Sequence, residues 1–83
     1  MNSDRLRPLE DIRLTHGQPR RFRWRGQWYI VADLLDSWRE VGEWWKEDSS
    51  EFRWWRVQTD DQGVFEIGWR EADKTWWLGR VWD

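Results

Sequence analysis

The alternation of apolar and polar side chains is the feature that most constrains this fold, and it is clearest in residues 19–31. In the first arm of that segment, Phe22 and Trp24 alternate with arginines, which places both rings on one face of a strand. Gly26 and Gln27 follow, and a glycine in the first position permits the positive φ of a type II′ hairpin turn. A second, mostly apolar arm then returns. The segment therefore predicts a β-hairpin.

The same kind of run recurs along the chain, separated by residues that favour turns. The segments with a strand pattern are residues 10–15, 21–25, 28–32, 51–59, 64–70 and 75–82. Regular spacing of short strands is typical of antiparallel meanders. We therefore expect an all-β fold, a small antiparallel barrel or a strongly curved meander of about six strands.

Residues 33–43 fit two structures. Leu34, Leu35, Trp38 and Val41 have the spacing of an apolar helix face, with an aspartate before them as a cap. The same residues can also extend the preceding strand around a bend or bulge. We favour a long bent strand and keep a short helix near residues 33–41 as the alternative.

The chain is long enough for one small domain. Residues 1–8 are polar and read as a frayed tail, whereas residues 9–83 read as a single Trp-rich domain. The start has no apolar segment of the secretory kind, and no run approaches the roughly 20 apolar residues of a membrane helix. Cysteine is absent, which rules out disulfides and thiolate metal sites and is consistent with a reducing cytoplasm.

Eleven tryptophans supply the means of stabilising such a small core. At about 25 cal/mol per Å², one well-buried indole contributes on the order of 4 kcal/mol before conformational entropy is subtracted. Six of the tryptophans form adjacent pairs at positions 44–45, 54–55 and 76–77. Neighbours on a strand point to opposite faces, so each pair should place one indole inside and one outside. Several indoles should therefore lie on an outer face or in a groove.

Charge is distributed unevenly along the chain. The net charge is −2, but residues 1–28 carry seven arginines and three acids, whereas residues 29–83 carry seven basic residues and thirteen acids. The overall acidity argues against a generally basic nucleic-acid binder, and the basic first third keeps local binding open.

Basic and aromatic side chains interleave in the predicted hairpin, which makes it the candidate binding surface. Arginines can follow phosphates while aromatic faces stack on unpaired bases, and the same residue types dominate protein interfaces. The alternative is a solvated face whose arginines pair with acids or lie on indoles. The candidate residues for protein or nucleic-acid binding are Arg20, Arg21, Arg23, Arg25, Trp24, Trp28, Tyr29, Trp44, Trp45 and Arg56.

No catalytic constellation stands out. His16 is the only histidine and lies in a predicted turn, without partners for a metal site or for proton transfer. Five acidic residues lie close together in a charge-rich loop: Glu40, Glu43, Glu47, Asp48 and Glu51. We expect these carboxylates to be solvated and not to act in general acid–base chemistry. We expect no enzyme activity, no metal and no cofactor.

Five stretches of the sequence resemble a bacterial family of small Trp-rich domains of unknown function: Pro19 to Val31, the Trp pair at 44–45, Phe52 to Val57, Gly63 to Ile67 and the ending Trp76 to Asp83. The resemblance covers residues 9–83. It implies a bacterial cytoplasmic protein whose relatives occur alone or beside genes for Y-family DNA polymerase-like proteins of mutagenic repair. It implies no catalytic residues.

These observations predict a non-catalytic interaction module that contacts a protein partner through a Trp/Arg surface, with a link to bacterial DNA repair or replication and repair-polymerase components as possible partners. Homodimerisation belongs to the same class. The alternative is single-stranded nucleic-acid binding through residues 20–25 and the neighbouring aromatics. A third is small-molecule binding in an aromatic-lined barrel.

Overall fold

The computed structural model describes residues 6–41 and 51–82, and that part of the chain contains seven β-strands and no helix. The strands are β1 (Arg7–Pro8), β2 (Asp11–Thr15), β3 (Gln18–Trp24), β4 (Gln27–Val41), β5 (Glu51–Thr59), β6 (Val64–Arg70) and β7 (Thr75–Trp82). The all-β class is confirmed. The alternation pattern also gave the bounds of β5, β6 and β7 correctly.

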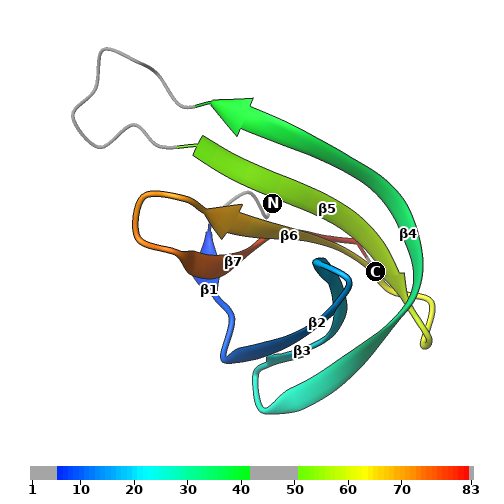
Figure 1. Ribbon diagram of the computed structural model, residues 1–83. Helices are drawn as coiled ribbons and strands as arrows, with labels where there is room; N and C mark the ends of the chain where they lie inside the picture. Colours follow the sequence, from blue (N-terminus) through cyan, green and yellow to red (C-terminus); the bar gives the residue numbers. More distant parts are fainter. Residues whose placement is uncertain (1–5, 42–50, 83) are drawn as a thin grey trace.

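All the strands belong to one antiparallel sheet in the order β1-β7-β6-β5-β4-β3-β2. The sheet is curled into a half-barrel with a concave inner face and a convex outer face (Figure 1). From β2 to β7 each strand pairs with its neighbour in sequence. The expected curved meander is therefore confirmed.

The long strand β4 bends the sheet. Its first residues pair with β3, and from Val31 onward it pairs with β5 as far as Val41. Register shifts after Val31 and after Leu34 insert extra residues, which increase the local twist and turn the strand. The long bent strand predicted for this segment is confirmed, and the helix at residues 33–41 is wrong. Pairing with β5 satisfies the backbone hydrogen bonds of this part of β4. The helical spacing of the leucines in β4 therefore does not decide the structure.

The start of the described chain closes the opposite side of the half-barrel. Arg7 and Pro8 pair with Leu78 and Trp77 of β7, whereas β2 pairs with β3. The pairing therefore begins within the segment that the sequence indicated as tail. Two residues are too few to show an alternating pattern in the sequence. Only the pairing with β7 shows that Arg7 and Pro8 form a strand.

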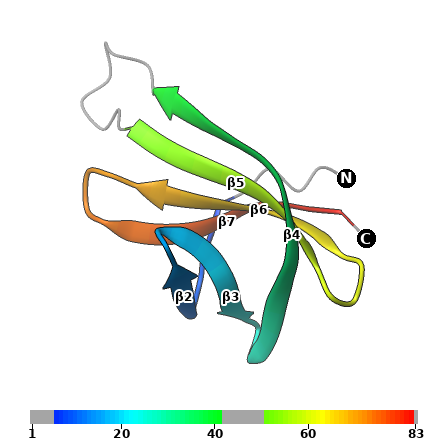
Figure 2. The same ribbon diagram turned by 45° about the vertical axis from the view of Figure 1, so that its right-hand side comes forward.

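The core lies on the concave face, where the β2–β3 hairpin lies across β5, β6 and β7 (Figure 2). Its buried residues are Phe22, Val31, Trp55, Val57, Phe65, Ile67 and Leu78. Val81 also packs against this core, because the register shifts between β6 and β7. Trp55 and Trp76 are inside while Trp54 and Trp77 are outside, as the pair argument predicted.

The β3–β4 turn lies one residue earlier than predicted. Trp24 pairs with Gln27, so Arg25 and Gly26 form the turn, with φ of 56° and 74°. Positive φ at both central residues is the type I′ geometry, which matches the right-handed twist of a hairpin. The predicted turn would pair Arg25 with Trp28, and each residue of β3 instead pairs with a residue two positions earlier in β4. Because side chains alternate with a period of two, every side chain keeps its predicted face. Similarly, Gln62 rather than the following glycine takes the left-handed position in the β5–β6 turn.

Candidate functional site

The arginines of the predicted binding hairpin do not form a free basic surface. Arg21 and Arg23 share the outer face of β3, but Arg23 pairs with Glu10 at 3.2 Å. Across the sheet, Arg21 lies opposite Arg13, which forms an ion pair with Asp11. Acids from the neighbouring chain segment therefore lie between the arginines.

The aromatics of this hairpin divide between its two faces. Trp28 is on the outer face beneath the guanidinium of Arg21, 5.2 Å from the ring centre. Trp24 and Tyr29 turn inward and pack against the core. Arg25, in the turn, lies over Trp24 at 4.6 Å.

Of the remaining predicted residues, Arg20 is exposed at the irregularity where β2 and β3 change register. Trp44 and Trp45 lie outside the described residues. The predicted set thus does not meet on one surface.

Arg56 belongs to a different assembly on the outer face. Its guanidinium lies 5.3 Å from the ring centres of both Trp38 and Trp82, and it also binds Glu66 at 3.0 Å. Trp38 stacks on Trp54, which extends the aromatic contact across β4 and β5.

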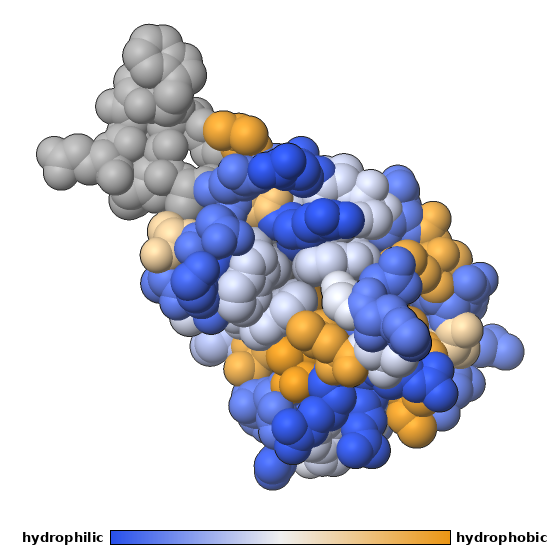
Figure 3. All heavy atoms as spheres, in the orientation of Figure 1, coloured by the Kyte–Doolittle hydropathy of each residue, from blue (hydrophilic) through white to orange (hydrophobic). Residues whose placement is uncertain are grey.

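The same assembly continues toward β7. Trp54 stacks on Phe52 at 5.3 Å, and Arg70 lies between Phe52 and Trp77. We call this row, from Trp82 through Arg56 and Trp54 to Trp77, the outer ladder. Its indoles are covered by guanidinium groups and by one another. On the face drawn in Figure 3, hydrophobic residues form small groups separated by polar ones. The cation–π and stacking contacts make the outer ladder a second packing layer, although Trp82 at its end is 37% exposed.

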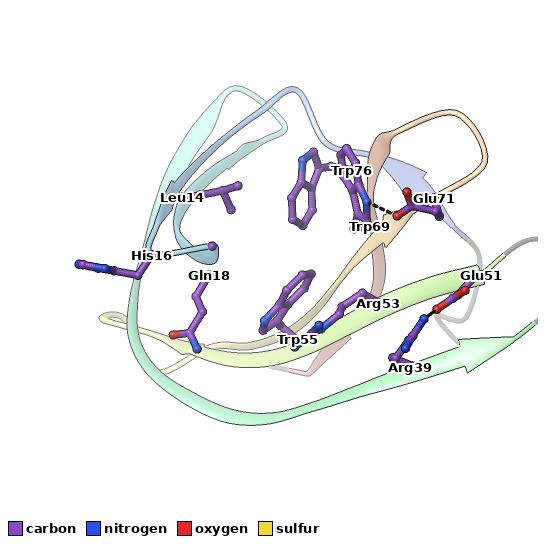
Figure 4. Close-up of a pocket in the computed structure, with 11 residues that line it drawn as sticks. Leu14, His16, Gln18, Arg39, Glu51, Arg53, Trp55, Trp69, Glu71 and Trp76 are labelled. Carbon is purple, nitrogen blue, oxygen red and sulfur yellow. Dashed lines mark hydrogen bonds and ion pairs between the residues drawn. The ribbon is translucent and has the colours of Figure 1, made fainter.

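A hollow of about 660 Å³ opens on the concave side of the half-barrel. Trp55, Trp69 and Trp76 line one side of it, and Leu14 and Gln18 of the β2–β3 hairpin lie on the other (Figure 4). His16, in the hairpin turn, points away from it (Figure 4). We call this hollow the tryptophan groove.

The register of four strands builds the groove. Arg39, Arg53, Trp69 and Trp76 are successive cross-strand partners on β4, β5, β6 and β7. Trp55 comes two residues after Arg53 on β5 and so points to the same side. The ring centres of Trp69 and Trp76 are 4.9 Å apart, and those of Trp55 and Trp76 are 5.4 Å apart. The three indoles form one continuous aromatic surface.

Two hydrogen-bond donors in the groove are unused. The indole N–H of Trp69 donates to the Glu71 carboxylate at 3.1 Å. Within residues 6–41 and 51–82, the indole N–H groups of Trp55 and Trp76 have no acceptor, and neither nitrogen is cut off from solvent. Buried indoles usually find an acceptor, so the two groups are available to a ligand.

The charged residues of the groove are not equally engaged. Arg39 forms an ion pair with Glu51 (Figure 4). Arg53 lies 5.4 Å from the Trp55 ring centre, and no carboxylate in the described part of the chain pairs with it. At the rim, the hydrogen bond from Trp69 and then Lys74 lower the pKa of Glu71 below its ordinary value, so this carboxylate is ionised at neutral pH.

The described residues contain no group of three or more His, Asp or Glu side chains placed to hold a metal ion. Nor does any helix in this part of the chain have the length and hydrophobicity needed to cross a membrane. What the groove offers is stacking surface, two indole donors and one guanidinium, which are elements of binding.

Sequence reasoning missed Trp55, Trp69, Trp76 and Arg53 as site residues. The alternation placed Trp69 inward and Trp76 on the face opposite Trp77, and neither indole was read as lining a binding site. A signal was present in the number of indoles, which exceeds what a small core needs. Which of them meet in a hollow depends on the register of β5, β6 and β7.

A sequence model of one protein family, described as "Domain of unknown function (DUF6504)", matches residues 8–83. No curated protein and no solved structure matches the chain.

Proposed function

We propose that this chain, which belongs to the family described as "Domain of unknown function (DUF6504)", is a non-catalytic interaction module that binds a partner protein through the tryptophan groove. The observation that carries the proposal is the contact of Trp55, Trp69 and Trp76 along an open hollow beside Arg53. The proposal keeps the predicted Trp/Arg chemistry and moves it from the β3 strand to the concave face.

The composition of the groove supports this assignment. Tryptophan and arginine are the residue types most enriched among interface hot spots, which lie in pockets that lose water on binding. The outer ladder contains the same residue types, but its guanidinium groups already cover its rings. In the groove, Trp69 and Trp76 are only half-buried and two indole donors are free.

The proposed partners are cytoplasmic proteins of bacterial DNA repair or replication, with repair-polymerase components tested first. The support is the resemblance of this sequence to small Trp-rich domains that occur beside such genes. Homodimerisation through the groove belongs to the same class, and sedimentation of the purified chain distinguishes the two.

Single-stranded nucleic-acid binding is the competing function. Its predicted surface on β3 is interrupted by Glu10 and Asp11, which pair with Arg23 and Arg13. In the groove, Glu51 pairs with Arg39, so Arg53 is a single guanidinium without a carboxylate partner among the described residues. A positively charged track, which such binding requires, is therefore missing from both places in the described structure.

The test compares three immobilised proteins: the wild type, Trp76→Gln in the groove, and Trp28→Ala on the outer face. Proteins captured from a bacterial lysate are purified and their affinities measured individually, with a single-stranded oligonucleotide titrated in parallel. Loss of a hot-spot tryptophan costs at least about 2 kcal/mol, or roughly 30-fold in Kd. We expect that loss for Trp76→Gln and less than threefold for Trp28→Ala.

Thermal unfolding shows whether Trp76→Gln is folded, and Trp69→Gln serves as a second groove variant. A partner bound equally by the wild type and both groove variants would contradict the proposal. So would the absence of any captured protein together with salt-sensitive binding of the oligonucleotide, which would favour the nucleic-acid function.

A further inference from the structure

We propose that the occupant of the tryptophan groove is a polyproline II segment with an acidic residue three positions from a proline. Arg53 binds the carboxylate, and the proline ring packs on Trp76. This inference rests on the proposed function, because it names the ligand class of the same groove.

The charge of the groove calls for an external carboxylate. Arg39 and Arg53 lie directly opposite each other on β4 and β5, and like charges in that position are destabilising. Glu51 neutralises Arg39, whereas no carboxylate among the described residues pairs with Arg53. Glu71 does not pair with Arg53, and accepts hydrogen bonds from Trp69 and Lys74. The Arg53 guanidinium lies against the Trp55 indole and can donate hydrogen bonds to the carboxylate of an acidic side chain.

The aromatic surface beside Arg53 suits proline. Grooves lined by aromatic side chains bind polyproline II segments, whose preformed shape lowers the entropy lost on binding. The backbone carbonyls of such a segment have no internal hydrogen bonds, so they are free to accept from a partner. The indole N–H groups of Trp55 and Trp76 are donors without an acceptor within the described structure.

Spacing connects the two subsites. Arg53 and Trp76 are separated by one strand, β6, in the same cross-strand row. Two strand spacings separate the backbones of these residues by about 9.6 Å. A polyproline II helix has three residues per turn and rises about 3.1 Å per residue, so positions i and i+3 share a face about 9.3 Å apart. A β-strand would place the same two residues on opposite faces. The row therefore matches a polyproline II ligand.

The probe is a capped heptapeptide with glutamate at its centre and three prolines on each side, so that the spacing is met in either direction. One control peptide replaces the glutamate by glutamine. Another replaces the first and last prolines, those three positions from the glutamate, by alanine. Binding is followed by tryptophan fluorescence and by the indole N–H resonances of Trp55 and Trp76.

We expect the glutamate peptide to bind about tenfold more tightly than the glutamine peptide, because a charge-assisted hydrogen bond is lost. Arg53→Gln should abolish that difference. Arg21→Gln, which removes another exposed arginine lying over an indole, should preserve it. The alanine peptide should bind severalfold more weakly than the glutamate peptide.

Equal affinity for the glutamate and glutamine peptides, or an unchanged difference in Arg53→Gln, would overturn the inference. Lack of any binding by the wild type would overturn it as well. If a protein partner nevertheless depends on Trp76, the proposed function stands and only the ligand class fails. The comparison of peptides on the wild type needs no variant, so poor folding of Arg53→Gln cannot obscure the result.

Discussion

Two glycines allow Trp54 to lie flat on the outer face, and replacing one of them tests the outer ladder. A Cβ added at Gly68 would lie 2.6 Å from Cζ3 of Trp54, and one added at Gly79 would lie 2.7 Å from the same atom. The ring is held by stacking on Phe52, and its N–H donates to Glu40 at 2.7 Å. Trp54 is only 7% exposed, although it belongs to the convex face.

Two opposing effects decide whether Gly68→Ala raises or lowers the free energy of unfolding. Alanine in a strand is normally more favourable than glycine by roughly 0.5–1 kcal/mol. Overpacking a fixed aromatic ring costs roughly 1–3 kcal/mol, because optimal carbon contacts are about 3.5–4.0 Å. The steric effect is larger, so Gly68→Ala should lower the free energy of unfolding by about 1–2 kcal/mol. The melting temperature should fall by roughly 4–16 °C.

A double-mutant cycle with Trp54→Leu isolates this contact. Without the indole, Gly68→Ala should be neutral or stabilising by up to about 1 kcal/mol, which gives a coupling energy of about 1–3 kcal/mol. Gly26→Ala is the matched control. Its φ is +74° with open space around it, so it should cost about 1 kcal/mol in both backgrounds. Urea unfolding measures all the variants. The reasoning is refuted if Gly68→Ala stabilises the wild type, or if its cost is unchanged in Trp54→Leu.

Three further outcomes are expected. Arg56→Lys should lower the free energy of unfolding by about 1 kcal/mol, because a lysine cannot lie flat between two indoles while binding Glu66; an unchanged urea midpoint would contradict this. Thr59→Val should cost about 1–2 kcal/mol, because Thr59 is 1% exposed and its hydroxyl donates to the Asp61 carboxylate in the β5–β6 turn; chemical denaturation tests it. The hydrogen bond from Arg70, and then that from Thr75, hold the pKa of Asp73 at about 2, below the ordinary 3.8. The stabilisation from Asp73 is therefore present above pH 3.8 and lost as the pH falls toward about 2. In Asp73→Asn, the loss of stability across that interval should be smaller, as thermal melts at several acidic pH values will show.

The sequence was most informative where one strand's own pattern decides the structure. The alternation in β5, β6 and β7 gave their bounds and the inward position of Trp69, and it placed Trp55 and Trp76 on the faces opposite Trp54 and Trp77. It failed where a distant segment decides. Nothing near Arg23 shows that Glu10 will pair with it. The β3–β4 turn was a separate, local error, because Trp24 pairs with Gln27 and one turn residue was misassigned.

The sequence by itself determined the all-β class and the face of almost every aromatic, because neighbouring side chains on a strand must alternate between the two sides of a sheet. Only the tertiary structure decided which inward residues meet. Register and bulges set that outcome, and they depend on pairing between strands far apart in the chain. The row of Arg39, Arg53, Trp69 and Trp76 exists because four strands align at those positions. The groove is therefore a property of the sheet that no single segment of the sequence contains.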